Sequence, residues 1–133
     1  MHFAKGSLEL LSKDFKAYEF DCPCDQCAET LIEPSLVFKL QEFRDEIGFP
    51  VKIMSGYRCH SHQESLKAAG YETAQGTSQH ELGLAVDVKT GHHTGEQLES
   101  VARAVGLMAV GRAPEWIHAD MRTDKVRSWS YKC

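Results

Sequence analysis

The hydrophobic residues between Pro34 and Ile47 recur at helical spacing. Leu36, Leu40 and Phe43 fall three or four positions apart, so that they share one face of a helix with Ile47. Proline suits the first turn of a helix, where its missing N–H is not needed. Because Gly48 then supplies a stop signal, the pattern predicts a helix over residues 34–47.

Capping residues indicate further helices. Thr94 precedes a helix predicted from Gly95 to about Val105, and Gln97 three residues on completes a capping box. Ser61 is the expected cap of a helix that runs to about residue 69 and ends at Gly70. The stretch 8–16 is the expected place of a further short helix.

Alternation with a period of two predicts strands. From Leu84 to Val88, Leu84, Val86 and Val88 share one face, and Ala85 and Asp87 share the other. Further expected strands cover 51–55, which reads as short and buried, 107–110 and 116–121, while 19–28 and 71–79 read as irregular or loop. The mixed order of helices and short strands predicts an α+β fold with a small antiparallel or mixed sheet.

Composition and charge narrow the function. The 133 residues carry no internal repeat or linker and are expected to form one domain, residues 1–133, as a monomer. A net charge of -4 argues against a nucleic-acid partner, because phosphate binding needs clustered Lys and Arg. We expect no membrane span, since no apolar run approaches about 18 residues. The N-terminus lacks a signal-peptide layout, which favours a cytoplasmic protein as synthesised.

Five cysteines are many for so short a chain. Cys22, Cys24 and Cys27 cluster, Cys59 lies mid-chain and Cys133 is last. An odd number does not form a closed set of disulfides, and clustered thiols in a reducing compartment are more often metal ligands or free buried residues. The sequence leaves three roles open for them: free thiols, a disulfide, or a second metal site with Cys59 or a histidine as fourth ligand. A zinc knuckle for nucleic acid is disfavoured by the acidic charge.

Two histidines and an aspartate form a candidate metal site. His80 lies in the loop entering the strand that carries Asp87, and Gly83 between them permits a turn. His118 lies on another predicted strand, with Trp116 and Asp120 on the same face. Each residue taken alone is more often a satisfied polar group or a surface residue. Together they offer what catalytic zinc needs: three protein ligands and an open fourth position for water.

Other polar residues could complete such a site. Glu115, three residues before His118, is a candidate general base, and Arg58 could bind a developing oxyanion or a substrate carboxylate, although a surface ion pair is its alternative. Asp120 is expected to orient a ligand histidine rather than to catalyse. The remaining histidines of the chain's central part are expected to be exposed polar residues near loops: His60, His62, His92 and His93.

Several spaced motifs resemble one family. Ser78-x-His80-x-x-Gly83-x-Ala85-x-Asp87, followed by Glu115-x-x-His118, is similar to the zinc D-alanyl-D-alanine carboxypeptidase family, which includes D-Ala-D-Ala dipeptidases and phage L-alanyl-D-glutamate endopeptidases. Ser55-Gly56-Tyr57-Arg58 and the segment 116–122 resemble its small stand-alone branch. The resemblance covers about residues 34–122. It implies the fold shared by these peptidases and the hedgehog signalling domain.

The resemblance also implies an activity. His80, Asp87 and His118 would bind Zn²⁺, Glu115 would be the general base, Arg58 would stabilise the transition state and Ser78 would contact substrate. The substrate would be a peptidoglycan stem peptide, and the small branch implies release to the cell wall during phage lysis. The alternative is a catalytically inactive, zinc-containing binding module on the same fold.

Overall fold

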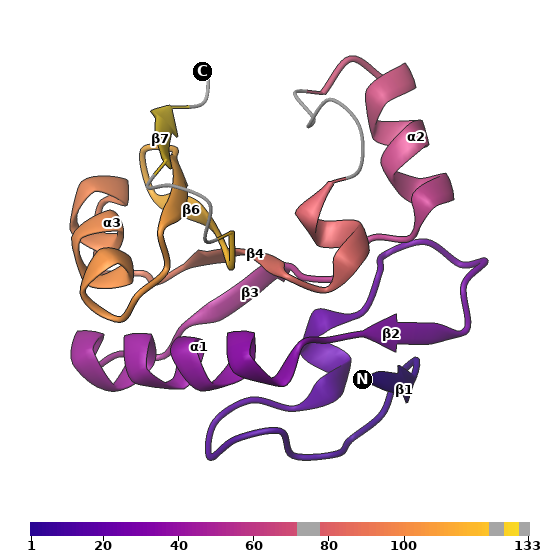
Figure 1. The fold of residues 1–133 in the computed structure, drawn as a ribbon, viewed down its shortest axis with the longest axis horizontal. Coiled ribbons are helices and arrows are strands. Elements are labelled where there is room, and N and C mark those ends of the chain that lie inside the picture. The colour runs from indigo at the N-terminus through magenta and orange to yellow at the C-terminus, as the bar shows by residue number, and fades with distance from the viewer. Residues whose placement is uncertain (72–77, 123–126, 131–133) are drawn as a thin grey trace.

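The computed structural model describes residues 1–71, 78–122 and 127–130. These residues form two separate sheets, three α-helices and two short 3-10 helices. Figure 1 shows how the labelled helices and strands are arranged. The helices are η1 (Ala17–Phe20), α1 (Pro34–Ile47), α2 (His60–Ala68), η2 (Gln79–Leu82) and α3 (Gly95–Ala104). Within this described part of the chain, no helix is long and apolar enough to cross a membrane.

The main sheet has five strands in the order β3-β4-β6-β5-β7. They are β3 (Lys52–Ser55), β4 (Ala85–Lys89), β6 (Trp116–Asp120), β5 (Ala109–Arg112) and β7 (Arg127–Ser130). All neighbours pair antiparallel except β5 and β7, which are parallel. A separate two-stranded antiparallel sheet pairs β1 (His2–Ala4) with β2 (Glu29–Leu31). The mixed sheet and its helices confirm the predicted α+β class.

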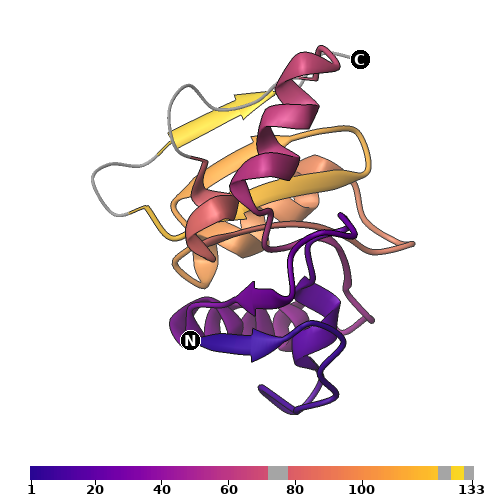
Figure 2. The same ribbon diagram turned by 90° about the vertical axis from the view of Figure 1, so that its right-hand side faces the viewer.

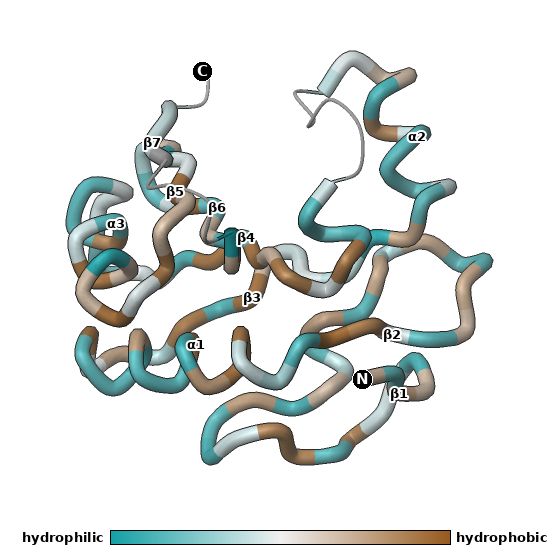
Figure 3. The backbone as a smooth tube through the Cα atoms, viewed as in Figure 1, coloured by the Kyte–Doolittle hydropathy of each residue, from teal (hydrophilic) through white to brown (hydrophobic). Residues whose placement is uncertain are grey.

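The core lies between the sheet and helices α1 and α3. Val86 and Val88 of β4 and Ile117 and Ala119 of β6 are buried and belong to one hydrophobic cluster with residues of both helices. Figure 3 shows hydrophobic and hydrophilic residues alternating along α1, as expected of a helix with one buried face. In both ribbon views α1 lies below the central strands, whereas α2 stands in the upper part of the molecule (Figures 1 and 2). The opposite face of β4 and β6 is therefore free of these two core helices.

Local signals set the ends of α1 and α3 where the sequence predicts them. Pro34 opens α1, and Gly48 ends it in the left-handed conformation, with φ of 76°. The Thr94 side chain accepts a hydrogen bond from the Gln97 backbone, and the Gln97 side chain accepts one from Thr94. Both helices confirm the prediction, although α3 ends at Ala104, one residue early.

Other expectations differ from the structure. No helix forms over residues 8–16: Leu10 pairs with Lys16 in an isolated bridge, and the nearby backbone groups bond one another across this turn. So short a segment gains little as an isolated helix, and Leu8 and Leu10 stay exposed. Helix α2 begins at His60 with Cys59 at its N-cap position, two residues before the predicted cap Ser61.

The strand predicted over 51–55 is shorter and less buried than expected. β3 begins at Lys52 and lies at the edge of the sheet, so its residues alternate between exposed and half-buried. The strands β1, β2 and β7 are additional to those predicted. The predicted loop 71–79 lies largely outside the described residues, and its last residue begins η2.

Candidate metal centre

The three candidate ligands come from three elements. His80 lies in η2, Asp87 in the middle of β4 and His118 in the middle of β6. The antiparallel register of β4 and β6 places Asp87 directly opposite His118. Gly83, with φ of 72°, ends η2 and turns the chain into β4. All three side chains are buried, and those of Asp87 and His118 lie on the sheet face opposite the core, because their strand neighbours belong to the core.

The ligand atoms form a compact triangle. His118 Nδ1 lies 3.1 Å from Asp87 Oδ1 and 3.2 Å from His80 Nε2, and His80 Nε2 lies 3.4 Å from the same Asp87 oxygen. Two ligand atoms of a tetrahedral zinc ion with bonds of about 2.0–2.1 Å are about 3.3 Å apart. The donor set and its spacing therefore fit a zinc ion with three protein ligands.

Hydrogen bonds orient both imidazoles. His80 Nδ1 donates to the carbonyl oxygen of Gly56 at 2.7 Å, which leaves Nε2 facing the triangle. His118 Nε2 lies 2.8 Å from Asp120 Oδ2, so that Nδ1 faces Asp87. Ligand histidines typically hold their second nitrogen in this way, on a carbonyl or a carboxylate. Arg122 in turn contacts Asp120 through Nε and Nη2, the latter at 2.7 Å.

Arg58 lies beside the triangle and contacts it through Asp87. Its Nη2 donates to Asp87 Oδ2 at 2.7 Å, which leaves Oδ1 toward the histidines. Its Nε donates to Ser55 Oγ at 3.0 Å, and its Nη1 to Gln63 Oε1 at 3.4 Å. Gln63 is buried on α2 and is a site residue that sequence reasoning missed. The sequence offers no signal for it, because a lone glutamine in a polar helix belongs to no chemical motif.

Ser78 and Glu115 lie elsewhere around the site. The Ser78 hydroxyl accepts a hydrogen bond from the His80 backbone at 3.2 Å and thereby caps η2. Glu115 is exposed, just before β6, and lines a surface pocket with residues of the β4 end that include Lys89 and His93. The structure thus brings Arg58, Ser78 and Asp120 into direct contact with the candidate ligands, and places Glu115 at the far end of the His118 strand.

Burial and charge set the protonation of the metal-free site. Burial lowers the pKa of His80, which favours the neutral imidazole that a metal needs. Burial alone would raise the pKa of Asp87, but its contacts with His118 and His80 hold it well below its usual range. Burial would also lower the pKa of His118, yet Asp120 and Asp87 raise it. The site is therefore already arranged around an anionic Asp87.

The other central histidines do not join this group. His60 Nδ1 lies 3.3 Å from Glu81 Oε1, and His93 Nδ1 lies 2.9 Å from the Thr90 hydroxyl. The His92 ring packs on Phe49 at 4.2 Å between centroids. Over residues 1–71, 78–122 and 127–130, the only groups of at least three ligand-type side chains close enough for a metal are His80–Asp87–His118 and a cluster of cysteines.

Comparisons with known proteins agree with this chemistry. The family model described as Peptidase M15 matches residues 13–120, which is most of the chain. No match was found among curated proteins or among solved structures. The matched range includes His80, Asp87 and His118 together with Arg58 and Glu115. The chain therefore belongs to the peptidase M15 family of zinc-dependent metallopeptidases.

Proposed function

We propose that this protein hydrolyses a peptide bond in the stem peptides of bacterial peptidoglycan, as a D-Ala-D-Ala carboxypeptidase or an L-Ala-D-Glu endopeptidase. The observation that carries the proposal is the triangle of His80 Nε2, Asp87 Oδ1 and His118 Nδ1, with edges of 3.1 to 3.4 Å. The family match and the motifs around these residues support the substrate class.

His80, Asp87 and His118 would hold Zn²⁺. When bound, the ion would lower the pKa of a water ligand toward about 7 and polarise the scissile carbonyl. The protein must hold each imidazole in a fixed orientation with an unprotonated nitrogen toward the ion. The Gly56 carbonyl oxygen, 2.7 Å from His80 Nδ1, and the Asp120 carboxylate, 2.8 Å from His118 Nε2, hold the other nitrogen of each ring.

Arg58 is proposed to act on both the site and the substrate. A guanidinium carries five N–H donors, and Ser55, Gln63 and Asp87 each accept one of them. Two donors thus remain for a substrate carboxylate or for the oxyanion that develops at the scissile carbonyl. Because Arg58 also fixes Asp87, its removal is expected to weaken zinc binding as well as turnover.

From the Glu115-x-x-His118 motif, and not from its position on the surface before β6, we propose Glu115 as the general base that accepts a proton from the attacking water and passes it to the leaving amine. We expect Glu115→Gln to retain zinc and to lose about 10²–10⁴-fold in turnover, since glutamine keeps the size but accepts no proton. Glu46→Gln, at an exposed position on α1, is the matched control and is expected to be fully active. Full activity in Glu115→Gln would reassign the base, with Asp120 the next residue to test.

A panel of synthetic stem peptides tests the substrate. Mass spectrometry of the products separates release of terminal D-Ala, which indicates a carboxypeptidase, from cleavage between L-Ala and D-Glu, which indicates an endopeptidase. Equal cleavage of an all-L peptide would refute the cell-wall assignment. Zinc-loaded protein that binds peptidoglycan without cutting any peptide would instead indicate a binding module.

A further inference from the structure

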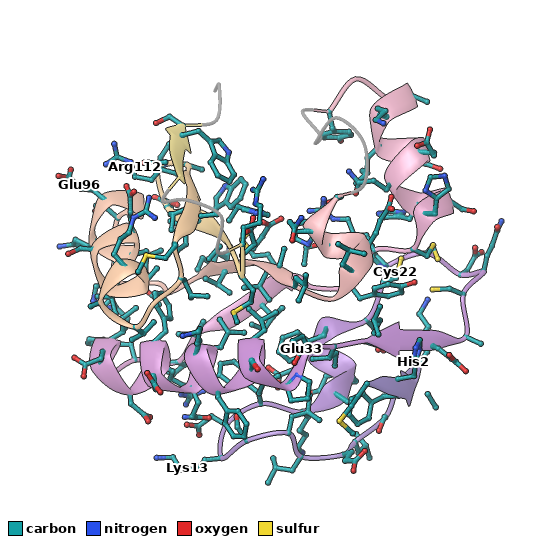
Figure 4. The ribbon with its side chains drawn as sticks, viewed as in Figure 1. His2, Lys13, Cys22, Glu33, Glu96 and Arg112 are labelled. Atoms are coloured by element: carbon teal, nitrogen blue, oxygen red, sulfur yellow. The ribbon has the colours of Figure 1, made fainter. Side chains whose placement is uncertain are left out.

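Four cysteine sulfurs meet at a second place in the fold. Cys22, Cys24 and Cys27 lie between η1 and β2, and Cys59 caps α2. Their Sγ atoms all lie within 4.8 Å of one another. Figure 4 shows Cys22 near the base of α2, with further sulfur atoms beside it. The four residues are distant in sequence from His80, Asp87 and His118.

The spacing of the sulfurs fits a metal ion. Cys24 Sγ lies 3.3 Å from Cys27 Sγ and 3.5 Å from Cys59 Sγ, and Cys22 Sγ lies 3.8 Å from Cys59 Sγ. Zinc–sulfur bonds of about 2.3 Å in a tetrahedron put the sulfurs about 3.8 Å apart. A disulfide would hold two sulfurs at about 2.05 Å, and all three of these distances are longer, so the four cysteines are free thiols here.

The surroundings suit a negatively charged cluster. Lys5 Nζ lies 3.7 Å from Cys27 Sγ and also donates to the Cys24 carbonyl oxygen. The Cys59 backbone N–H donates to Cys22 Sγ at 3.4 Å. Four thiolates around a divalent cation leave a net charge of −2, which the Lys5 ammonium partly offsets. His60, next in sequence to Cys59, is exposed and turned to Glu81, so Cys59 and not this histidine supplies the fourth ligand.

We propose that Cys22, Cys24, Cys27 and Cys59 bind a structural Zn²⁺, separate from the ion of the peptidase site. Four protein ligands close the coordination sphere, which leaves no open position for water or substrate. Binding releases the thiol protons to solvent as the sulfurs become ligands.

The cysteine site has a clear structural role. It ties the segment after η1 to the segment 55–59, which also pair through the Tyr57 N–H and the Phe20 carbonyl at 2.8 Å. Arg58, which binds Asp87, lies between Tyr57 and Cys59, and Gly56, whose carbonyl orients His80, is next to Tyr57. The four cysteines are therefore positioning residues for the peptidase site and do not themselves touch the substrate.

Metal analysis tests the proposal without reference to hydrolysis. The wild-type protein is expected to hold two zinc ions per chain, and Cys27→Ser and His118→Ala are each expected to hold one. After replacement by Co²⁺, His118→Ala should keep the strong thiolate-to-cobalt charge-transfer absorption, and Cys27→Ser should lose most of it. Cys133→Ser removes the fifth cysteine, which lies outside the described residues, and serves as the control with two zinc ions.

The wild-type protein and His118→Ala decide the matter even if Cys27→Ser does not fold. One zinc per wild-type chain that is lost in His118→Ala, or no thiolate-to-cobalt absorption in His118→Ala, would overturn the proposal. Mass spectrometry of the denatured protein gives a second test: a mass lower by two hydrogens for each pair of cysteines would show disulfides and would also overturn the proposal. A protein that holds two zinc ions but cleaves no peptide would refute the proposed peptidase function and would still support the cysteine site.

Discussion

Replacing Asp120 tests whether the contact behind His118 supports metal binding. Asp120 is fully buried, lies 2.8 Å from His118 Nε2, and contacts Arg122 at 2.7 and 3.0 Å. Asn has one carbonyl oxygen and one amide, so it can still accept from His118 but presents the amide to Arg122. Ala removes both acceptors.

These contacts predict the order in which the two substitutions lower the affinity for zinc. Removing the partner of a ligand histidine typically lowers metal affinity by about 10–100-fold, or about 1.4–2.7 kcal/mol. We expect Asp120→Asn at the lower end, because one acceptor survives, and Asp120→Ala at the upper end. Asp45→Asn, exposed on α1, is the control and should bind zinc as the wild type does.

Competition with a chromophoric chelator at fixed pH measures the affinity. The zinc that His118→Ala retains is subtracted from the zinc bound by each protein, so that the variants and the wild type are compared only at the site of His80, Asp87 and His118. If Asp120→Ala binds zinc within about twofold of the wild type, the carboxylate does not support the ligand, and the reasoning from this contact is wrong.

Two further outcomes follow from backbone geometry and from charge. Gly83→Ala is expected to lower the free energy of unfolding clearly more than Gly48→Ala does. Both glycines have positive φ, which costs a residue with a side chain about 1–2 kcal/mol. The new Cβ at Gly83 would also lie 2.6 Å from the Leu31 carbonyl oxygen, whereas nothing lies within 4 Å of a Cβ at Gly48. Urea unfolding of both variants checks the order, and equal losses would contradict it. In the metal-free protein, the pKa of Asp120 is lowered to about 2 from 3.8 although burial opposes this, because His118 and Arg122 bond the anion. This lowered pKa contributes about 2 kcal/mol to the stability above pH 4, and the contribution is lost as the pH falls toward 2. In urea unfolding between pH 5 and 2, the free energy of unfolding should therefore fall less steeply for Asp120→Asn than for the wild type. Parallel curves for the two proteins would refute the assignment.

Local sequence signals predicted the parts of the fold that depend on local interactions. Pro34 with Gly48, and Thr94 with Gln97, act within one or two turns, so α1 and α3 could be placed nearly to the residue. The strands β1, β2 and β7 depend on partners distant in sequence, and their short segments carry little alternation of their own. The helix expected over 8–16 was wrong, because Leu8 and Leu10 bury little of their surface and stay exposed.

The candidate site was predictable in its residues but not in its contacts. Alternation along β6 places His118 and Asp120 on one face, as expected, and the structure joins them by a hydrogen bond. The sequence carries no sign that Asp87 faces His118, because that depends on the pairing of β4 with β6. The Gly56 carbonyl and the Gln63 amide were missed because backbone groups and lone amides carry no chemical motif.

The pairing of β4 with β6 also has a consequence for folding. A slip of one residue would turn Asp87 toward the core and bring Val86 or Val88 to the site, since side chains alternate between faces. A slip of two residues would keep the face but separate Asp87 from His118 by about 7 Å more along the strands. Either slip separates the three ligand atoms, so zinc would not bind to, or stabilise, a misaligned sheet. Zinc binding would add its free energy only to chains whose strands β4 and β6 are correctly paired, and would thereby favour the correct register.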